Sequence, residues 1–351
     1  QLEKLLERCM ASSCDFAEIF EEEGTTESLS MLNGELEDTN VLIRAGIGIR
    51  LYKGVQSVYG YTNETNEESL NALVDDLRGG FGIESKSVSI SLVEEKHENR
   101  HPIKENPVKA SLESKVALMV RANDAAKTYS DKIQKVSVGL ASVCQNVQIS
   151  NSEGRLVHDT RIRCRMSVSS FAQDGQNLQS GYEAPGASKG LEFFEERTPE
   201  SIGKEASRIA LVLLEAKDCP SGKMPVIIDN GFGGVIFHEA CGHALEASSV
   251  SKNQSVFCNK LGQKVASDKV TAIDDGTIPN AWGSQNVDDE GNLQQKRVLI
   301  ENGILKSYMV DRLNGRRMGL ESTSSSRRQS YKFETTSRMT NTYIAAGNDD
   351  F

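Results

Sequence analysis

The sequence predicts an α+β protein, and three observations lead to that class. Apolar and polar residues alternate over Val136–Cys144, as they do in a strand with one buried face. Turn signals such as Asn33-Gly34 separate runs of this kind. Apolar residues at helical spacing occur between them, as in residues 1–14. We therefore expect antiparallel strands and helices together in one chain.

Several helices are expected in the first half. Residues 1–14 place Leu2, Leu5, Leu6 and Cys9 on one helical face. Thr65 and Glu68 have the spacing of a capping box, so a helix is expected from there to Gly79-Gly80. Two more helices are expected over 111–129 and after Thr198-Pro199, where Thr is a good N-cap and Pro a good first residue.

Hairpins connect the expected strands. Asn33-Gly34 and Lys53-Gly54 each lie between two apolar runs. Residues 132–183 are expected to form an antiparallel meander that reverses at Asn151-Ser152-Glu153-Gly154.

The stretch Lys217–Lys223 contains a Pro and a Gly, and we place a domain boundary there. We expect an N-terminal α+β domain over 1–219. A C-terminal, mainly antiparallel β domain is expected over 220–351, beginning with a short buried strand at Pro225–Ile228. A glycine-rich turn, Asp229–Gly234, then leads into a helix that carries two histidines. Later strands at 297–301 and 304–309 are joined by Asn302-Gly303.

Composition excludes some classes of protein. The net charge is −10, and no basic stretch is long enough to follow a phosphate backbone, so no nucleic-acid partner is expected. The seven cysteines include no CxxC pair, which argues against a disulfide framework. No apolar run of the ~18 residues needed to span a membrane occurs, and no signal peptide is recognisable, so we expect a cytoplasmic protein.

One motif carries chemistry: His238-Glu239-Ala240-Cys241-Gly242-His243, in a chain with only five histidines. Imidazole nitrogens suit Zn²⁺, and a glutamate beside the first ligand can take a proton from a water activated by the metal. Apolar neighbours on both sides predict a mostly buried helix, in which these polar groups are costly unless paired or bound to metal.

The spacing is one residue longer than in the His-Glu-x-x-His metalloproteases. In an α-helix, residues i and i+5 are offset by about 140°, whereas i and i+4 are offset by about 40°. A π-turn with about 4.4 residues per turn brings i and i+5 within about 50° of each other. We therefore predict a π-turn or break near Ala240–His243, favoured by Gly242.

Four stretches resemble the TldD branch of the TldD/PmbA metallopeptidase family. They are GFGGVIFHEACGHALEA (231–247), TAIDDGTIPNAWGS (271–284), DRLNGRRMGLESTSSSRRQSY (311–331) and SRMTNTY (337–343). The segment GYEAPG (181–186) is also similar, and the likeness extends along essentially the whole chain.

This resemblance implies a zinc peptidase acting on unfolded or extended peptides, with His238 and His243 as ligands and Glu239 as general base. It also implies a homodimer, or a heterodimer with a PmbA/TldE-like subunit. The family's third ligand is a cysteine in a C-terminal segment. None of the seven cysteines corresponds to it, so we expect that ligand to lie in a part absent from this sequence.

Other interpretations stay open. The two histidines could be ordinary buried side chains. Cys241 is expected to pack in the core, and Cys258 is expected to be a structural or surface residue. Glu246 could support His243 or form an unrelated ion pair. The charges of Asp311–Arg317 could bind a substrate carboxylate or pair within the protein. An alternative function is a non-catalytic peptide-binding or partner subunit of a TldD/PmbA-type complex.

Overall fold

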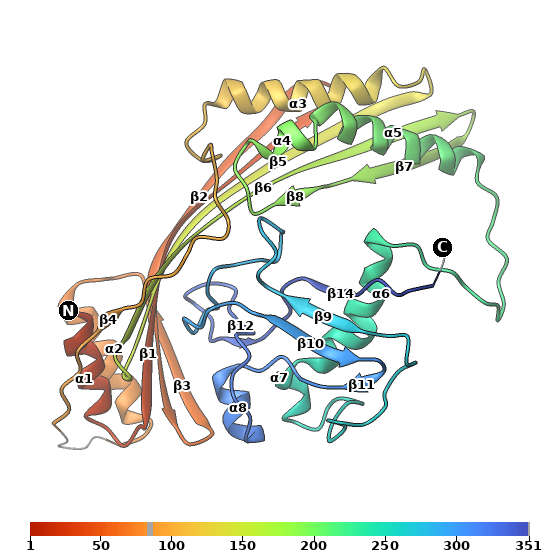
Figure 1. Cartoon of the computed structure of the whole chain (residues 1–351). Helices are drawn as coiled ribbons and strands as arrows, with labels where there is room; N and C mark the ends of the chain where they lie inside the picture. Colours follow the sequence, from red (N-terminus) through yellow and green to blue (C-terminus); the bar gives the residue numbers. More distant parts are fainter. Residues whose placement is uncertain (83–86, 350–351) are drawn as a thin grey trace.

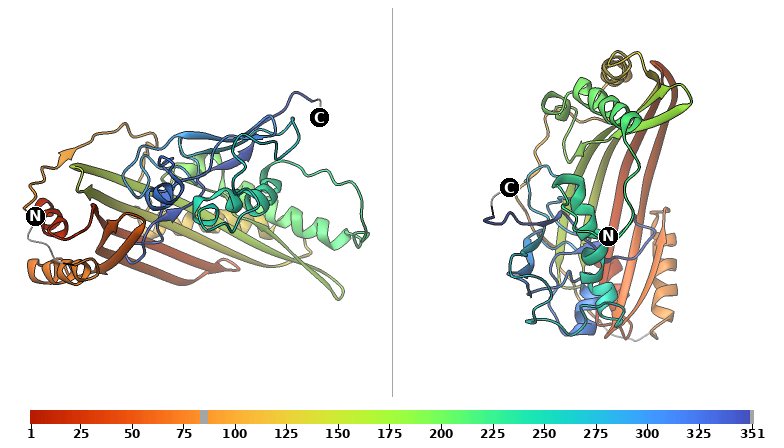
Figure 2. Two further views of the ribbon diagram at one scale, coloured as in Figure 1. Left: turned by 90° about the horizontal axis from the view of Figure 1, so that it is seen from below. Right: turned by 90° about the vertical axis from the view of Figure 1, so that its right-hand side faces the viewer.

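A computed structural model describes residues 1–82 and 87–349 and confirms the α+β class (Figure 1). A long, curved sheet forms the middle layer. Helices from residues 1–215 cover one face of it, and the C-terminal part of the chain lies against the opposite face (Figures 1 and 2). No helix among the described residues is long and apolar enough to cross a membrane.

The large sheet has eight strands in the order β3-β2-β1-β5-β6-β4, and β7 and β8 also pair with β6. All of its pairings are antiparallel except that of β4 with β6. The strands are β1 (Phe16–Leu32), β2 (Glu35–Lys53), β3 (Gln56–Thr62), β4 (Val93–Glu94), β5 (Ile133–Asn151), β6 (Arg155–Asp174), β7 (Asn177–Glu183) and β8 (Gly186–Ala187).

The expected hairpins and meander are confirmed. Asn33 and Gly34 both have positive φ, at 50° and 90°, which is the backbone that a tight turn between strands requires. The strands are longer than their apolar alternation suggests, because β1 and β2 run for 17 and 19 residues. The first half of β2 is largely exposed, most of all at Ile43. Pairing with β1, rather than burial of side chains, keeps this part of the chain in the strand.

The helices pack on one face of this sheet at both of its ends. In β1, Ala17 and Ile19 join the core beneath α1 and α2, whereas Leu29 and Met31 join the core beneath α3 and α5. These odd-numbered residues share one face because side chains alternate along a strand. The helices are α1 (Leu2–Met10), α2 (Glu67–Gly79), α3 (Leu112–Lys127), α4 (Phe193–Glu196) and α5 (Pro199–Glu215).

Helix starts follow the expected capping chemistry with one correction. Thr198 caps α5, as predicted, and its side chain accepts a hydrogen bond from the Ser201 amide. Thr65 does not cap α2: Asn66 does, by accepting from the Ser69 amide. Asn is at least as good an N-cap as Thr, and it displaces the start by one residue.

The C-terminal part builds two small sheets. One has the order β11-β10-β9-β14, and the other pairs β12 with β13. The expected hairpin at Asn302-Gly303 is confirmed, although its second strand is only two residues long. The elements are β9 (Ala272–Asp275), β10 (Lys296–Glu301), β11 (Ile304–Leu305), α8 (Arg312–Met318), β12 (Ser326–Arg327), β13 (Thr336–Ser337) and β14 (Thr342–Ile344).

Tyr331 fixes part of the contact between this unit and the large sheet. Its ring packs with Phe20, Val147 and Ile149, and its amide donates to Glu22. A Cβ atom at Gly46 of β2 would lie 2.3 Å from the ring, so only glycine leaves room there. The even-numbered side chains of β1 therefore meet the C-terminal part.

The expected buried strand at Pro225–Ile228 is wrong. This segment forms no strand, and Ile227 is 98% exposed. A strand needs a neighbour for its backbone groups, and none of the described residues pairs with it. The division of the chain at residues 219 and 220 stays a prediction.

Candidate metal centre

The His-Glu motif lies in an irregular helical segment. It begins with a 3₁₀ turn, Gly231–Gly234, and one turn of α6 (Val235–Phe237). A π-helical turn follows over His238–Gly242, and the His243 amide donates to the His238 carbonyl five residues earlier. A 3₁₀ turn (His243–Leu245) and α7 (Ala247–Val250) complete the segment. The predicted π-turn is confirmed.

The π-turn brings the two imidazoles to one side. Their ring centroids lie 4.8 Å apart, with the rings nearly perpendicular. One ligand atom from each of His238, Glu239 and His243 lies within 4.8 Å of the other two. Ligand atoms around a tetrahedral zinc are roughly 3.3 Å apart. Small side-chain rotations therefore suffice for these groups to share an ion, and the residues fit a metal.

His243 is held in a defined orientation. Its Nδ1 atom lies 3.2 Å from a carboxylate oxygen of Glu246, and its Nε2 atom lies 4.0 Å from a carboxylate oxygen of Glu239. The buried Glu246 also accepts from Arg338 at 3.1 Å. A carboxylate on Nδ1 leaves Nε2 free to bind a metal, which is the usual support of a histidine ligand. The possible support of His243 by Glu246 is thus present as a contact.

The predicted burial of this segment is wrong. The side chains of Glu239 and His243 are 67% and 41% exposed, and Phe232 is 88% exposed. Only part of the segment, including Phe237 and Leu245, reaches the core of the C-terminal unit. The motif therefore faces outward. At His238, partial burial still lowers the pKa of the imidazole, and the nearby His243 adds to that effect.

An apolar cleft of about 680 Å³ runs along the same segment. Ile236, Ala240 and Cys241 line it on one side, and Tyr343 and Ile344 of β14 line it on the other. β14 is at an edge of its sheet among the described residues. The metal-binding candidates thus adjoin both an apolar surface and a strand edge.

Other candidate residues have structural surroundings. Arg312 of α8 pairs with Glu153 in the turn between β5 and β6, and Arg316 pairs with Asp15 just before β1, so both charges are used within the protein. Cys241 packs against the C-terminal core, as expected, and Cys258 packs against the same core, in a structural position. Among the described residues, no cysteine joins the group of His238, Glu239 and His243.

Sequence reasoning missed Arg338. It lies 92 residues from Glu246, and no local pattern joins the two. Its position inside the family-like segment 337–343 is the one signal that could have pointed to it.

The chain is similar to known proteins along most of its length. Three family models match successive parts of the chain. They are the PmbA/TldA metallopeptidase domain 1 over residues 17–79, the central domain over 105–214, and the C-terminal domain over 221–351.

Similar curated proteins are named metalloproteases. A metalloprotease TldD homolog of Buchnera aphidicola is 35% identical over 97% of this chain and 72% of its own length. A homolog of the same name from Haemophilus influenzae is 34% identical over 96% and 71%. A metalloprotease of Methanocaldococcus jannaschii is 34% identical over 100% and 77%. These names, with the His-Glu-His group, support a metallopeptidase.

Solved structures share the fold at low sequence identity. TldE from Thermococcus kodakarensis has a TM-score of 0.74 and 20% identity, covering 99% of this chain and 78% of its own. A Thermotoga maritima protein, solved under the name of a DNA gyrase modulator, has a TM-score of 0.80 and 22% identity, covering 100% and 79%. With three family models in sequence order and relatives above 30% identity, the chain belongs to the PmbA/TldD metallopeptidase family.

Proposed function

We propose that this chain is a zinc-dependent peptidase in which His238 and His243 hold the metal and Glu239 is the general base. The observation that carries the proposal is the π-turn, which brings one ligand atom from each of two imidazoles and a carboxylate within 4.8 Å of one another. In a regular α-helix, two histidines at this spacing would not face the same metal, because their rings would lie on different faces. The names of the relatives add support.

The residues divide the work. A bound zinc supplies Lewis acidity to the scissile carbonyl and to the attacking water. Glu239 accepts a proton from that water and returns it to the leaving amine, as its exposed carboxylate near His243 Nε2 permits. Glu246 keeps the Nδ1 proton of His243 and so orients the ring. The third ligand that the family resemblance implies, a cysteine, is not in the described group.

The proposed substrate is an unfolded or extended peptide. The edge of β14 can hydrogen-bond an added strand, and the apolar cleft beside it can take side chains without strict selection. Main-chain recognition of this kind gives broad sequence tolerance. For partners, we propose a dimer, formed with a second copy or with a PmbA/TldE-like subunit, and the fold shared with TldE supports the second case.

The test compares wild type with Glu239→Gln. We expect both to bind zinc equally, whereas kcat for hydrolysis of an unstructured peptide falls by about 10²–10⁴ in the variant, because the base is lost. Glu321→Gln, at an exposed position, is the matched control. Zinc content is measured by elemental analysis. Equal hydrolysis by wild type and Glu239→Gln would remove the assigned role of Glu239. Absence of hydrolysis by both proteins would favour a non-catalytic peptide-binding subunit.

A further inference from the structure

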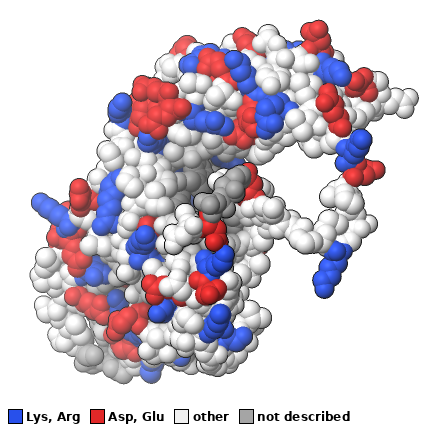
Figure 3. All heavy atoms as spheres, turned by 45° about the vertical axis from the view of Figure 1, so that its right-hand side comes forward, with Lys and Arg blue, Asp and Glu red and all other residues white. Residues whose placement is uncertain are grey.

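A cavity between the large sheet and the C-terminal unit is rich in arginine. It has a volume of about 240 Å³ and is lined by five guanidinium groups and two carboxylates, those of Glu22 and Asp289. The arginines are Arg44, Arg161, Arg163, Arg327 and Arg328. The protein as a whole carries a charge of −10, and the face seen in Figure 3 mixes both signs. The cavity is thus a local excess of positive charge.

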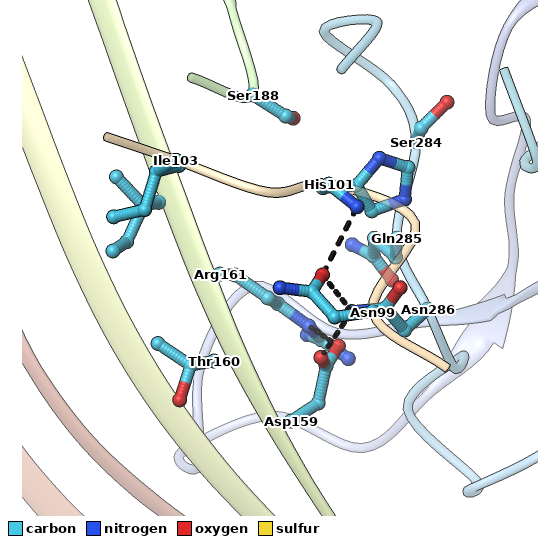
Figure 4. A pocket seen from close by; sticks show the side chains of 11 residues that line it. Asn99, His101, Ile103, Asp159, Thr160, Arg161, Ser188, Ser284, Gln285 and Asn286 are labelled. Atoms are coloured by element: carbon cyan, nitrogen blue, oxygen red, sulfur yellow. Dashed lines mark hydrogen bonds and ion pairs between the residues drawn. The ribbon is translucent and has the colours of Figure 1, made fainter. Parts of the chain in front are cut away.

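Three of the five arginines are neutralised within the protein. Arg161 pairs with Asp159 at 3.2 Å and Asp289 at 2.6 Å, and it points toward Asp159 in the neighbouring polar cavity (Figure 4). Arg328 pairs with the buried Glu18 at 3.3 Å. Arg44 pairs with Glu22 at 3.6 Å. Their charges are used in fixing the fold.

Arg163 has no such partner. Among the described residues, no carboxylate lies within 4.0 Å of its guanidinium, its side chain forms no hydrogen bond, and its buried Nε atom is unsatisfied. Its guanidinium lies 5.9 Å from the centroid of the Trp282 ring. Burial and the charge of Arg161 lower the pKa of Arg163 to about 10, which still leaves it charged at neutral pH. Arg163 is partly buried, and the carboxylates that act on it, Asp159 and Asp289, lie beyond 4.0 Å and already pair with Arg161. A bound anion would therefore reduce the cost of placing this cation here.

Arg327 connects the cavity with the candidate metal centre. It has no carboxylate within 4.0 Å among the described residues, and it donates one hydrogen bond, to the Met339 carbonyl. It also lines a small crevice together with Arg338, whose guanidinium holds Glu246 and, through it, His243. The cavity and the candidate metal centre are therefore linked through Arg327, Arg338 and Glu246.

We propose that this cavity binds a carboxylate of the peptide substrate, with Arg163 and Arg327 as the receiving guanidinium groups. The inference rests on the proposed peptidase function, because it makes the anion part of an extended peptide that crosses the metal centre. A guanidinium fork matches a carboxylate in shape and charge. The carboxylate can come from the C-terminus of a peptide or from a Glu or Asp side chain, and the two sources are separable by experiment.

Peptide binding tests the proposal without turnover. Three fluorescent Ala/Ser octapeptides are used: one with a free C-terminus, one amidated, and one amidated with an internal Glu. Their affinities for Glu239→Gln are measured by fluorescence anisotropy, with and without a second change, Arg163→Gln. We expect Arg163→Gln to weaken binding of at least one carboxylate-bearing peptide about tenfold and to leave the amidated neutral peptide unchanged. Which peptide responds identifies the source of the carboxylate.

Arg165→Gln is the matched control. Arg165 is two residues along β6, lies 5.9 Å from the same Trp282 ring, and does not line the cavity. Arg163→Lys keeps the charge without the fork and is expected to recover part of the affinity. Equal effects of Arg163→Gln and Arg165→Gln, or equal loss for all three peptides, would overturn the site. Added salt should weaken the part of the binding that depends on a carboxylate, because it screens the charges. If salt left that binding unchanged for every peptide, the result would also contradict the site.

The outcome separates this proposal from the peptidase itself. If binding of a carboxylate-bearing peptide depends on Arg163 but the wild type hydrolyses no peptide, the carboxylate site is supported and the peptidase function is rejected. If wild type and Arg163→Gln hydrolyse the neutral and the carboxylate-bearing peptides with the same KM, the peptidase function is supported and the carboxylate site is rejected.

Discussion

At the scale of single residues, Glu246 connects the metal-binding candidates to the rest of the C-terminal unit. It is buried and lies between the Nδ1 atom of His243 and the guanidinium of Arg338. Burial raises the pKa of Glu246, while the charges of Arg338 and His243 oppose that rise. In the folded protein, contacts with His243 and Arg338 therefore replace the water that would surround this carboxylate in the unfolded chain.

Replacing Glu246 is expected to weaken metal binding. In Glu246→Gln, the amide keeps the size of the side chain but loses the charge that fixes the His243 proton and ring. Loss of such a supporting carboxylate costs about 10–100-fold in metal affinity. Competition with a chromogenic zinc chelator measures it, and Glu321→Gln is the control. An unchanged affinity would mean that Glu246 has only a structural role.

The residues that sequence analysis found are those whose relation is local. His238, Glu239 and His243 lie within six positions, so a single local π-turn is enough to bring them together. Arg338 reaches Glu246 from 92 residues away, and Arg163 of β6 lines a separate cavity, so only the folded chain gives each of them its place. Pairing across long sequence distances has no local signal.

At the scale of elements, the π-turn depends on close packing at Gly242. A Cβ atom there would lie 2.4 Å from the Met339 sulfur, which is buried. Sequence analysis predicted the π-turn because the spacing demanded it and glycine permitted it. It failed for Pro225–Ile228, where an apolar run predicted a strand and no described strand pairs with it. Turns are set by a few adjacent residues, whereas strands require a distant neighbour.

Gly242→Ala is expected to destabilise the fold by about 1–3 kcal/mol, because the added methyl group overpacks the contact with Met339. Gly234→Ala is the control, since no atom lies within 4 Å of its Cβ position. Urea denaturation measures both variants. The double variant Gly242→Ala/Met339→Ala should show favourable coupling, and strictly additive losses would contradict the packing argument.

At the scale of the whole molecule, the C-terminal unit meets the large sheet through a buried polar loop. Asp289 pairs with Arg161 of β6, and Glu290 accepts from the Arg312 amide. Asp288 holds this loop in shape by accepting from the amides of Glu290, Asn292 and Ser326. The acidic run Asp288-Asp289-Glu290 gave no hint in the sequence of a buried interface, because such runs are usually exposed to solvent.

This loop should make stability depend on pH. Burial raises the pKa of Asp288 from its ordinary 3.8 to about 6, against the pull of its hydrogen bonds. A carboxyl with a raised pKa binds its proton more tightly in the folded than in the unfolded chain. Its contribution to stability is therefore smallest above pH 6 and grows as the pH falls from about 6 toward 4.

Asp288→Asn isolates that contribution, because the amide cannot take up the proton while other groups titrate as before. The free energy of unfolding is measured in urea at pH 7.5 and pH 5.0 for both proteins. Between these two values of pH, wild type should gain about 1 kcal/mol relative to Asp288→Asn. Asp268→Asn, at an exposed position, controls for introducing an amide. A difference between wild type and Asp288→Asn that is independent of pH would mean that Asp288 stays ionised in the folded protein and that the loop tolerates its buried charge.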